Sequence, residues 1–146
     1  MSMRSNLTRQ RRQVEDTPGD LAMFSEMLAD YGAYRLRRIM REAFAGLEVR
    51  LVVLRRIAAR AEVAPGEARP GDVEKCARQL QFLRIEGLDA GLRGFPEACR
   101  AHERRARHGV ALAKAEAEAL ADNCRAARER MERLLRVLVA KGPQIA

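Results

Sequence analysis

Apolar residues recur at alternating steps of three and four along the C-terminal part of this chain. The stripe consists of Val110, Ala113, Ala117, Leu120, Cys124, Ala127, Met131, Leu134 and Leu138. Residues three and four apart lie on one side of an α-helix, so this spacing predicts a long helix with a narrow apolar seam. A second stripe of the same kind consists of Met40, Phe44, Leu47, Leu51, Leu54, Ala58 and Ala61. Each seam needs another helix to cover it, and we therefore expect helix–helix packing to dominate the fold.

Four helices are predicted from the apolar periodicity and from the residues that bound it. They cover residues 20–31, 33–62, 72–92 and 97–140. No run of alternating apolar and polar residues predicts a strand, and no turn dipeptide joins two such runs. We therefore predict an all-α fold, an antiparallel helical bundle of about four helices with long, coiled-coil-like members, the last of about 44 residues.

Proline, glycine and acidic residues set the predicted helix boundaries. Pro18 is expected in the first turn of the first helix, and Asp72 is expected to cap the third. Two Pro-Gly pairs within residues 64–71 predict a loop. Gly32 falls where the apolar pattern changes register, so residues 18–62 are expected to form either two helices or one kinked helix.

The predicted helices belong to a single domain over residues 17–142. It lies between a basic polar arm at 1–16, expected to be flexible, and a short tail at 143–146. At 1.5 Å per residue the last helix would span roughly 66 Å and the second roughly 45 Å. The last helix would then extend beyond its partner, and its seam would need a second chain. The two long helices match in length only if residues 18–62 form one helix.

The middle of the second predicted helix is apolar on nearly every side. Its leucines belong to the seam, whereas Val49, Val52 and Val53 lie around the opposite side. A helix of this kind is normally buried, either at the centre of a bundle or against another subunit. We predict self-association or the docking of a protein partner. The residues expected at this interface are Leu51, Val53, Leu54, Leu120, Met131, Leu134 and Leu138.

The chain is strongly basic, with 28 Lys+Arg against 20 Asp+Glu, a net charge of +8 and a pI near 10.4. This balance favours anionic partners such as nucleic acid, although a GC-rich genome alone would also enrich arginine. The second predicted helix carries many arginines and few acids, and Glu116, Glu118 and Asp122 of the last helix are candidates to pair with some of them. The residues expected to contact an anion are Arg9, Arg11, Arg12, Arg38, Arg41, Arg55 and Arg56.

No catalytic, cofactor-binding or metal-ligating set is predicted. His102 and His108 lie six residues apart, which places them on different faces of a helix, and arginines stand close to both in the sequence. No serine has a histidine within predictable reach, so a nucleophile activated by a base is not expected. Cys76, Cys99 and Cys124 fall on predicted seams, and we expect them to pack as small buried hydrophobic side chains.

The odd number of cysteines favours a reducing compartment, and the polar N-terminal residues lack the apolar segment of a secretory leader. No stretch approaches the roughly 20 apolar residues of a membrane-spanning helix. We therefore expect a cytoplasmic protein with no membrane span, no cofactor and no small-molecule substrate.

The function predicted from these features is a non-catalytic helical interaction or scaffold module that self-associates or docks a protein partner along its seams. The alternative is a backbone-directed, weakly sequence-specific nucleic-acid-binding protein that uses the basic arm and the second helix. Few aromatic residues stand beside the arginines, and base stacking is therefore not expected. A further alternative is a helical chaperone of the secretion type. An enzyme is not predicted.

Overall fold

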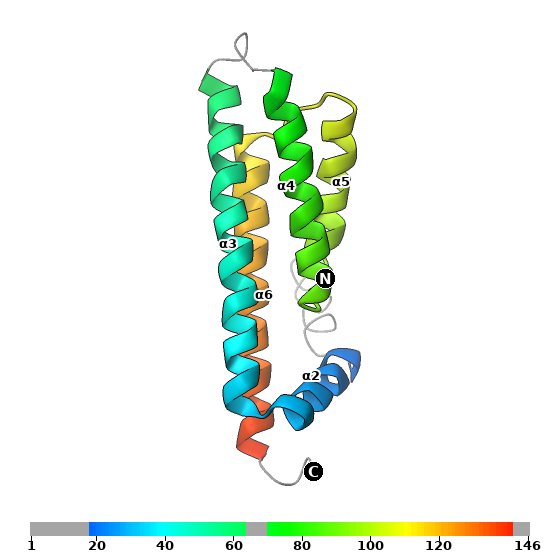
Figure 1. Ribbon diagram of the computed structural model, residues 1–146, viewed down its shortest axis with the longest axis vertical. Helices are drawn as coiled ribbons and strands as arrows, with labels where there is room; N and C mark the ends of the chain where they lie inside the picture. The colour runs from blue at the N-terminus through cyan, green and yellow to red at the C-terminus, as the bar shows by residue number, and fades with distance from the viewer. Residues whose placement is uncertain (1–17, 64–69, 142–146) are drawn as a thin grey trace, which may run out of the picture. The chain divides into compact units, whose positions relative to one another are not determined.

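The computed structural model describes residues 18–63 and 70–141, and this part of the chain is all-helical with no strand. Its helices are α2 (Pro18–Tyr31), α3 (Ala33–Val63), α4 (Pro70–Asp89), α5 (Phe95–Arg107) and α6 (Lys114–Lys141) (Figure 1). The all-α class is confirmed. The predicted arm at 1–16, most of the predicted loop at 64–71 and the tail at 143–146 lie outside the described residues.

The predicted helix over 97–140 is wrong, because the chain forms α5 and α6 with a connection between them. Gly109 adopts a φ of +82°, which an L side chain rarely tolerates. Its N–H donates to the carbonyl of Ala106, and the N–H of Val110 donates to the carbonyl of Arg105. This pair of bonds is the Schellman motif that ends many helices. Val110, predicted to begin the seam, is accordingly exposed in the connection.

The α4–α5 connection also contains a Schellman motif. Gly91 has a φ of +75°, and its N–H and that of Leu92 donate back to carbonyls of Leu88 and Gly87. The helix therefore ends at Asp89 rather than at the predicted residue 92. Asp72 also differs from its prediction: α4 begins at Pro70, so this acid lies inside the first turn instead of capping it.

Gly32 separates α2 from α3, which decides between the break and the kink that the sequence left open. It has a φ of +78°, and its N–H donates to the carbonyl of Leu28 over a distance of 2.8 Å. A single hydrogen bond of this kind, donated by a residue in the left-handed conformation, is the αL motif that ends many helices. The predicted start of the first helix near Pro18 is confirmed.

The described residues divide into two compact units, one of residues 18–39 and 129–141 and one of residues 40–63 and 70–128. The single domain predicted over 17–142 stays a prediction. In the described part of the first unit, the buried apolar side chains come from three helices. They are Phe24 of α2, Leu36 of α3, and Met131, Leu135 and Leu138 of α6. In this part of α6 the buried position is Leu135, whereas the predicted seam residue Leu134 is half-buried.

The second unit holds residues 40–63 of α3, all of α4 and α5, and residues 114–128 of α6. These segments run alternately up and down, as in an antiparallel bundle (Figure 1). Leu47 and Leu54 of α3, Leu80 of α4 and Ala117 of α6 are completely buried. A Cβ built on Gly87 would meet a ring carbon of Phe95 at 3.1 Å, so this glycine permits close approach of α4 and α5. Most members of the two stripes found in the sequence are thus core positions.

Replacing Gly109 with alanine is expected to lower the free energy of unfolding by about 1–2 kcal/mol. A Cβ here meets no heavy atom within 4 Å, so the cost comes from the left-handed backbone alone. Gly46→Ala is the matched control. Gly46 lies inside α3, its Cβ would meet only Glu86 Oε2 at 3.8 Å, and helix propensity predicts a gain of up to about 1 kcal/mol. Urea unfolding followed by circular dichroism measures both changes. Equal stability of Gly109→Ala and the parent would contradict the left-handed helix end.

Candidate interaction surfaces

The residues predicted to form a partner interface lie mostly inside the chain. Leu51, Leu54, Leu120, Met131 and Leu138 are each exposed by 5% or less. Leu134 is half-buried, and Val53, at 37%, is the exposed member of the set. Five of the seven predicted interface positions are therefore core residues, and most of the seam positions are buried within the chain.

The seams need no second chain because the helix lengths differ from those predicted. The Schellman motif at Gly109 shortens the last helix to 28 residues, against 31 for α3. At 1.5 Å per residue these helices span roughly 42 and 46 Å, so the excess length that suggested an uncovered seam disappears. Helix length therefore gives no support for self-association.

The predicted anion contacts are exposed where the structure describes them. Arg38, Arg41, Arg55 and Arg56 all lie on the surface of α3, whereas Arg9, Arg11 and Arg12 lie outside the described residues. Arg38 already has an interaction partner and is therefore not free. Arg41, Arg55 and Arg56 make no ion pair with any described residue.

An exposed strip of α3 combines these arginines with valines, and we call it the outer α3 face. It consists of Arg41, Ala45, Val49, Val52, Val53, Arg55 and Arg56. Steps of three and four connect its members along one side of the helix. Val49 is 66% exposed and Val52 43%, which confirms that the valines lie opposite the buried stripe. The strip is apolar in the middle and carries arginines at both ends, and Glu42 and Glu48 are exposed on the same side of the helix.

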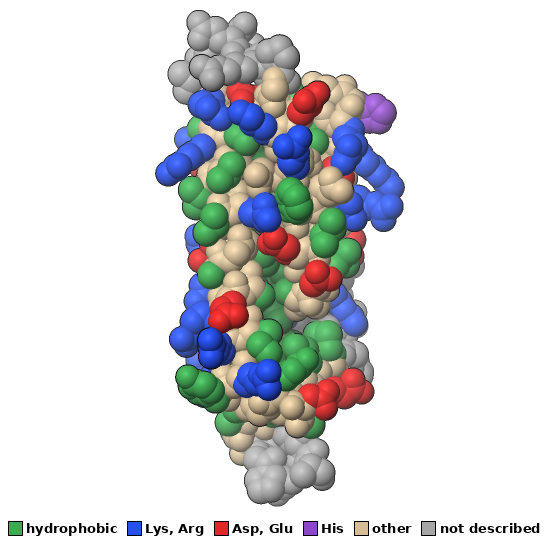
Figure 2. Space-filling model, viewed as in Figure 1, with side chains coloured by type: hydrophobic (Ala, Val, Ile, Leu, Met, Phe, Trp, Pro, Cys, Tyr) green, Lys and Arg blue, Asp and Glu red, His purple; other side chains and the backbone are tan. Residues whose placement is uncertain are grey.

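Arg50 joins α3 to α4 beside this face. Its Nε donates to Glu86 Oε1 at 2.8 Å and its Nη1 to Gln79 Oε1 at 3.4 Å. Its guanidinium also lies 4.3 Å from the centre of the Phe82 ring, a cation–π contact. Arg50 is therefore a structural contact within the unit. In Figure 2, hydrophobic side chains are exposed over α3 and α4 among charged ones.

The expected pairing of α3 arginines with the acids at 116, 118 and 122 is not what joins the two helices. Arg128 Nη1 of α6 donates to Glu48 Oε1 of α3 at 2.7 Å, so the acid comes from α3 and the base from α6. Glu116 contacts α5, and Asp122 pairs with Arg125 of its own helix. The outer α3 face therefore keeps its positive charge.

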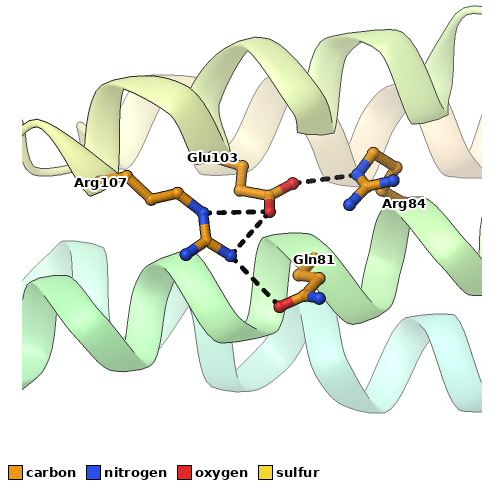
Figure 3. Close-up of polar contacts among 4 residues, drawn as sticks. All are labelled: Gln81, Arg84, Glu103 and Arg107. Carbon is orange, nitrogen blue, oxygen red and sulfur yellow. Dashed lines mark hydrogen bonds and ion pairs between the residues drawn. The ribbon is translucent and has the colours of Figure 1, made fainter.

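A buried carboxylate holds two arginines between α4 and α5 (Figure 3). Glu103 of α5 is 6% exposed. Its Oε2 accepts a hydrogen bond from Arg84 Nε of α4 at 3.0 Å. Its Oε1 accepts from Arg107 Nη2 at 3.0 Å and from Arg107 Nε at 3.3 Å. The same Nη2 donates to Gln81 Oε1 at 3.3 Å, which completes a link across the two helices.

The electrostatics of this network keep Glu103 ionised. Burial acts to raise the pKa of the carboxyl, but the hydrogen bonds and positive charges of Arg84 and Arg107 outweigh it and lower the pKa below its usual value. An open groove of about 440 Å³ lies next to the network. Its lining residues are Glu74, Ala77, Arg78 and Gln81 of α4 and Ala106 and Arg107 of α5.

A second carboxylate joins α5 to the start of α6. Glu116 Oε1 accepts a hydrogen bond from the backbone N–H of Ala113, which is half of a capping box. Its Oε2 accepts from Arg105 Nη1 at 2.6 Å and lies 3.3 Å from His102 Nδ1, a buried atom without a well-aligned partner. Burial acts to raise the pKa of Glu116, but the Ala113 and Arg105 hydrogen bonds lower it overall. These contacts fix the corner between the helices.

All three cysteines are free and buried, as their seam positions predict. Burial raises the pKa of the Cys99 thiol to about 12 and that of Cys124 to about 11, and it also raises the pKa of Cys76. Thiols with raised pKa values are poor nucleophiles and poor metal ligands at neutral pH. Among the described residues, no three His, Cys, Asp or Glu side chains gather where they could hold a metal ion.

Sequence reasoning missed Glu103, the central residue of the α4–α5 network. A signal was present, because Glu103 stands four residues after Cys99 and three before Ala106, on the stripe that α5 buries. An acid on a buried stripe requires hydrogen-bonding or charged partners. Its arginine partner four residues later, Arg107, was likewise visible in the sequence, whereas Arg84 comes from another helix.

No family model matches this sequence, and neither a curated protein nor a solved structure matches it. Among the described helices, none combines the length and the apolar character needed to cross a membrane. Function is therefore inferred from the side chains and surfaces described above.

The Glu103 network is expected to make stability depend on pH. The pKa of the Glu103 carboxyl is lower in the folded protein than in the unfolded chain. The stabilisation is therefore fully present above the ordinary glutamate pKa of about 4.3, and it is lost as the pH falls through the pKa of the folded protein. Glu103→Gln should lower the free energy of unfolding at neutral pH by about 1–3 kcal/mol. Urea unfolding of both proteins at several pH values should show this difference shrinking in acid.

Asp122→Asn is the control for this experiment. The Asp122–Arg125 pair spans 3.4 Å and both side chains are mostly exposed, so its loss should change stability by about 0.5 kcal/mol or less. A Glu103→Gln variant that differs from the parent by the same amount at every pH would contradict the role given to the ionised carboxylate.

Proposed function

We propose that this chain is a non-catalytic helical interaction module that binds an acidic protein partner through the outer α3 face. The single observation that carries the proposal is the exposure of Val49, Val52 and Val53 between unpaired arginines. Apolar side chains on a helix surface, bounded by charge, are typical of sites that receive a partner helix. The raised pKa values of the buried cysteines agree with a non-catalytic role.

The positive charge of the outer α3 face favours an acidic partner over a second copy of this chain. Arg41 lies at one end of the face and Arg55 and Arg56 at the other, and none of the three is neutralised by a described residue. Glu42 and Glu48, the exposed acids on this side of α3, already have interaction partners. A second copy meeting this face would therefore bring unpaired arginines together, whether the two α3 helices ran parallel or antiparallel. Such like-charge contacts are strongly unfavourable at an interface. An amphipathic helix with an apolar stripe flanked by Asp and Glu avoids them.

The valines also favour a protein over nucleic acid at this position. A phosphate backbone gains little from three aliphatic side chains, since its recognition rests on arginine, lysine and hydrogen-bond donors. Burial of the valines against apolar side chains would contribute roughly 25 cal/mol per Å² removed from water. The predicted cytoplasmic location is compatible with this proposal and stays a prediction.

The test uses a synthetic amphipathic helix of about 16 residues, long enough to cover the roughly 23 Å from Arg41 to Arg56. One version carries a leucine stripe flanked by glutamates, and a second replaces the glutamates with lysines. Calorimetry should detect binding of the acidic peptide only. Val49→Asp should weaken this binding about tenfold or more, equivalent to at least about 1.4 kcal/mol. Arg55→Gln with Arg56→Gln should weaken it and reduce its salt dependence.

Two matched variants serve as controls. Val110→Asp alters another exposed valine, 45% exposed against 66% for Val49, that lies in the α5–α6 connection and should leave binding unchanged. Arg100→Gln with Arg104→Gln removes the same charge from another helix and should also have little effect. Equal binding of both peptides, or equal loss with Val110→Asp, would overturn the proposal. Light scattering that showed a dimer abolished by Val49→Asp would instead assign the face to a second copy and would equally overturn it.

A further inference from the structure

The α4–α5 side of the second unit carries a separate group of arginines, which we call the α5 arginine row. It consists of Arg100, Arg104 and Arg107, at steps of four and three along one side of α5. Figure 2 shows Lys and Arg side chains gathered along the edge that α5 forms, on the right in this view. Arg100 and Arg104 are exposed and make no ion pair with a described residue.

Arg107 is the member of the row that the fold orients. Its Nε and Nη2 are held by Glu103 and Gln81, while its side chain remains 55% exposed. In Figure 3 its other terminal nitrogen takes no part in the network. A guanidinium already held in one geometry loses little conformational entropy when it binds an anion. Arg107 also lines the groove, together with Arg78 from α4.

The charge at this site is positive even after its acids are counted. Glu103 is buried and forms ion pairs with both Arg84 and Arg107, so its negative charge is already balanced by these two arginines. The groove lining contains one acid, Glu74, and two arginines, Arg78 and Arg107. Arg100 and Arg104 extend the positive charge along α5 beyond the groove. A ligand that contacts the groove and the row together must carry negative charge at several points along its length.

We propose that the groove and the α5 arginine row bind linked phosphates, as in a nucleic-acid strand or an oligophosphate. Arginine matches phosphate oxygens with two parallel donors, and several arginines in a row can follow successive phosphates. No aromatic residue belongs to the row or to the groove lining, so the site contacts phosphates and does not read bases. This proposal does not depend on the partner proposed for the outer α3 face.

The test measures the affinity of a fluorescent oligothymidylate of about 12 nucleotides by anisotropy, at a series of salt concentrations. Binding to the full chain should weaken steeply with salt, by about 0.7 logarithmic units per phosphate contact for each tenfold rise. Arg100→Gln with Arg104→Gln should weaken binding at least about tenfold and lower the salt slope by about 1.4. Both side chains are exposed, and circular dichroism checks that the fold is kept.

The matched control is Arg55→Gln with Arg56→Gln, which removes the same charge from α3 and should leave the affinity within about twofold of the parent. Oligonucleotides of other base sequence should bind alike. Displacement of the oligothymidylate by tripolyphosphate at matched phosphate concentration would support the proposal for linked phosphates in general, and resistance to displacement would support it for a nucleic-acid strand. Absence of binding at low salt, or equal weakening by the two double variants, would overturn it.

Discussion

The left-handed backbone at glycine determines where α2, α4 and α5 end. Gly32, Gly91 and Gly109 each hold a positive φ and return hydrogen bonds to the last turn of the preceding helix. They end α2, α4 and α5 after 14, 20 and 13 residues, and they separate these helices from α3 and α6, which have 31 and 28 residues. With α5 stopped at Arg107, the chain reverses and α6 can begin as a separate helix with its own buried stripe. The assignment of apolar side chains to core or surface follows from these lengths.

Helix ends also explain why the strongest apolar signals in the sequence do not form the interaction surface. The leucine stripes of α3 and α6 are used within the chain, and the apolar groups left outside are the valines opposite the α3 stripe. Those valines are few, and arginines bound them. The proposed function therefore rests on these valines and not on the heptad stripes, because only groups that folding leaves exposed can contact a partner.

Arginine has two distinct roles in the second unit. Arg50, Arg84 and Arg107 bind carboxylates or amides between helices, and through Glu86, Glu103, Gln79 and Gln81 they hold α3, α4 and α5 together. Arg41, Arg55, Arg56, Arg100 and Arg104 remain exposed and supply positive surface. Net charge alone does not separate these roles. The outer α3 face and the α5 arginine row differ in what accompanies the charge: valines at the first, and an oriented guanidinium beside a groove at the second.

The sequence by itself determined the helical class, the buried stripe of α3, the position of the valines opposite it and the burial of the cysteines, because side-chain period is a local property of a helix. That these valines are exposed was decided by the tertiary structure. The sequence also contained Glu103 on the α5 stripe and glycine at 109, but the prediction of one continuous helix over 97–140 gave neither residue a role. Only the tertiary structure decided that the two stripes lie inside one chain and that Arg84 meets Glu103 and Arg128 meets Glu48. The physical reason is that periodicity determines which side of a helix must be covered, whereas the covering helix depends on where the chain reverses and on contacts between residues far apart in the sequence.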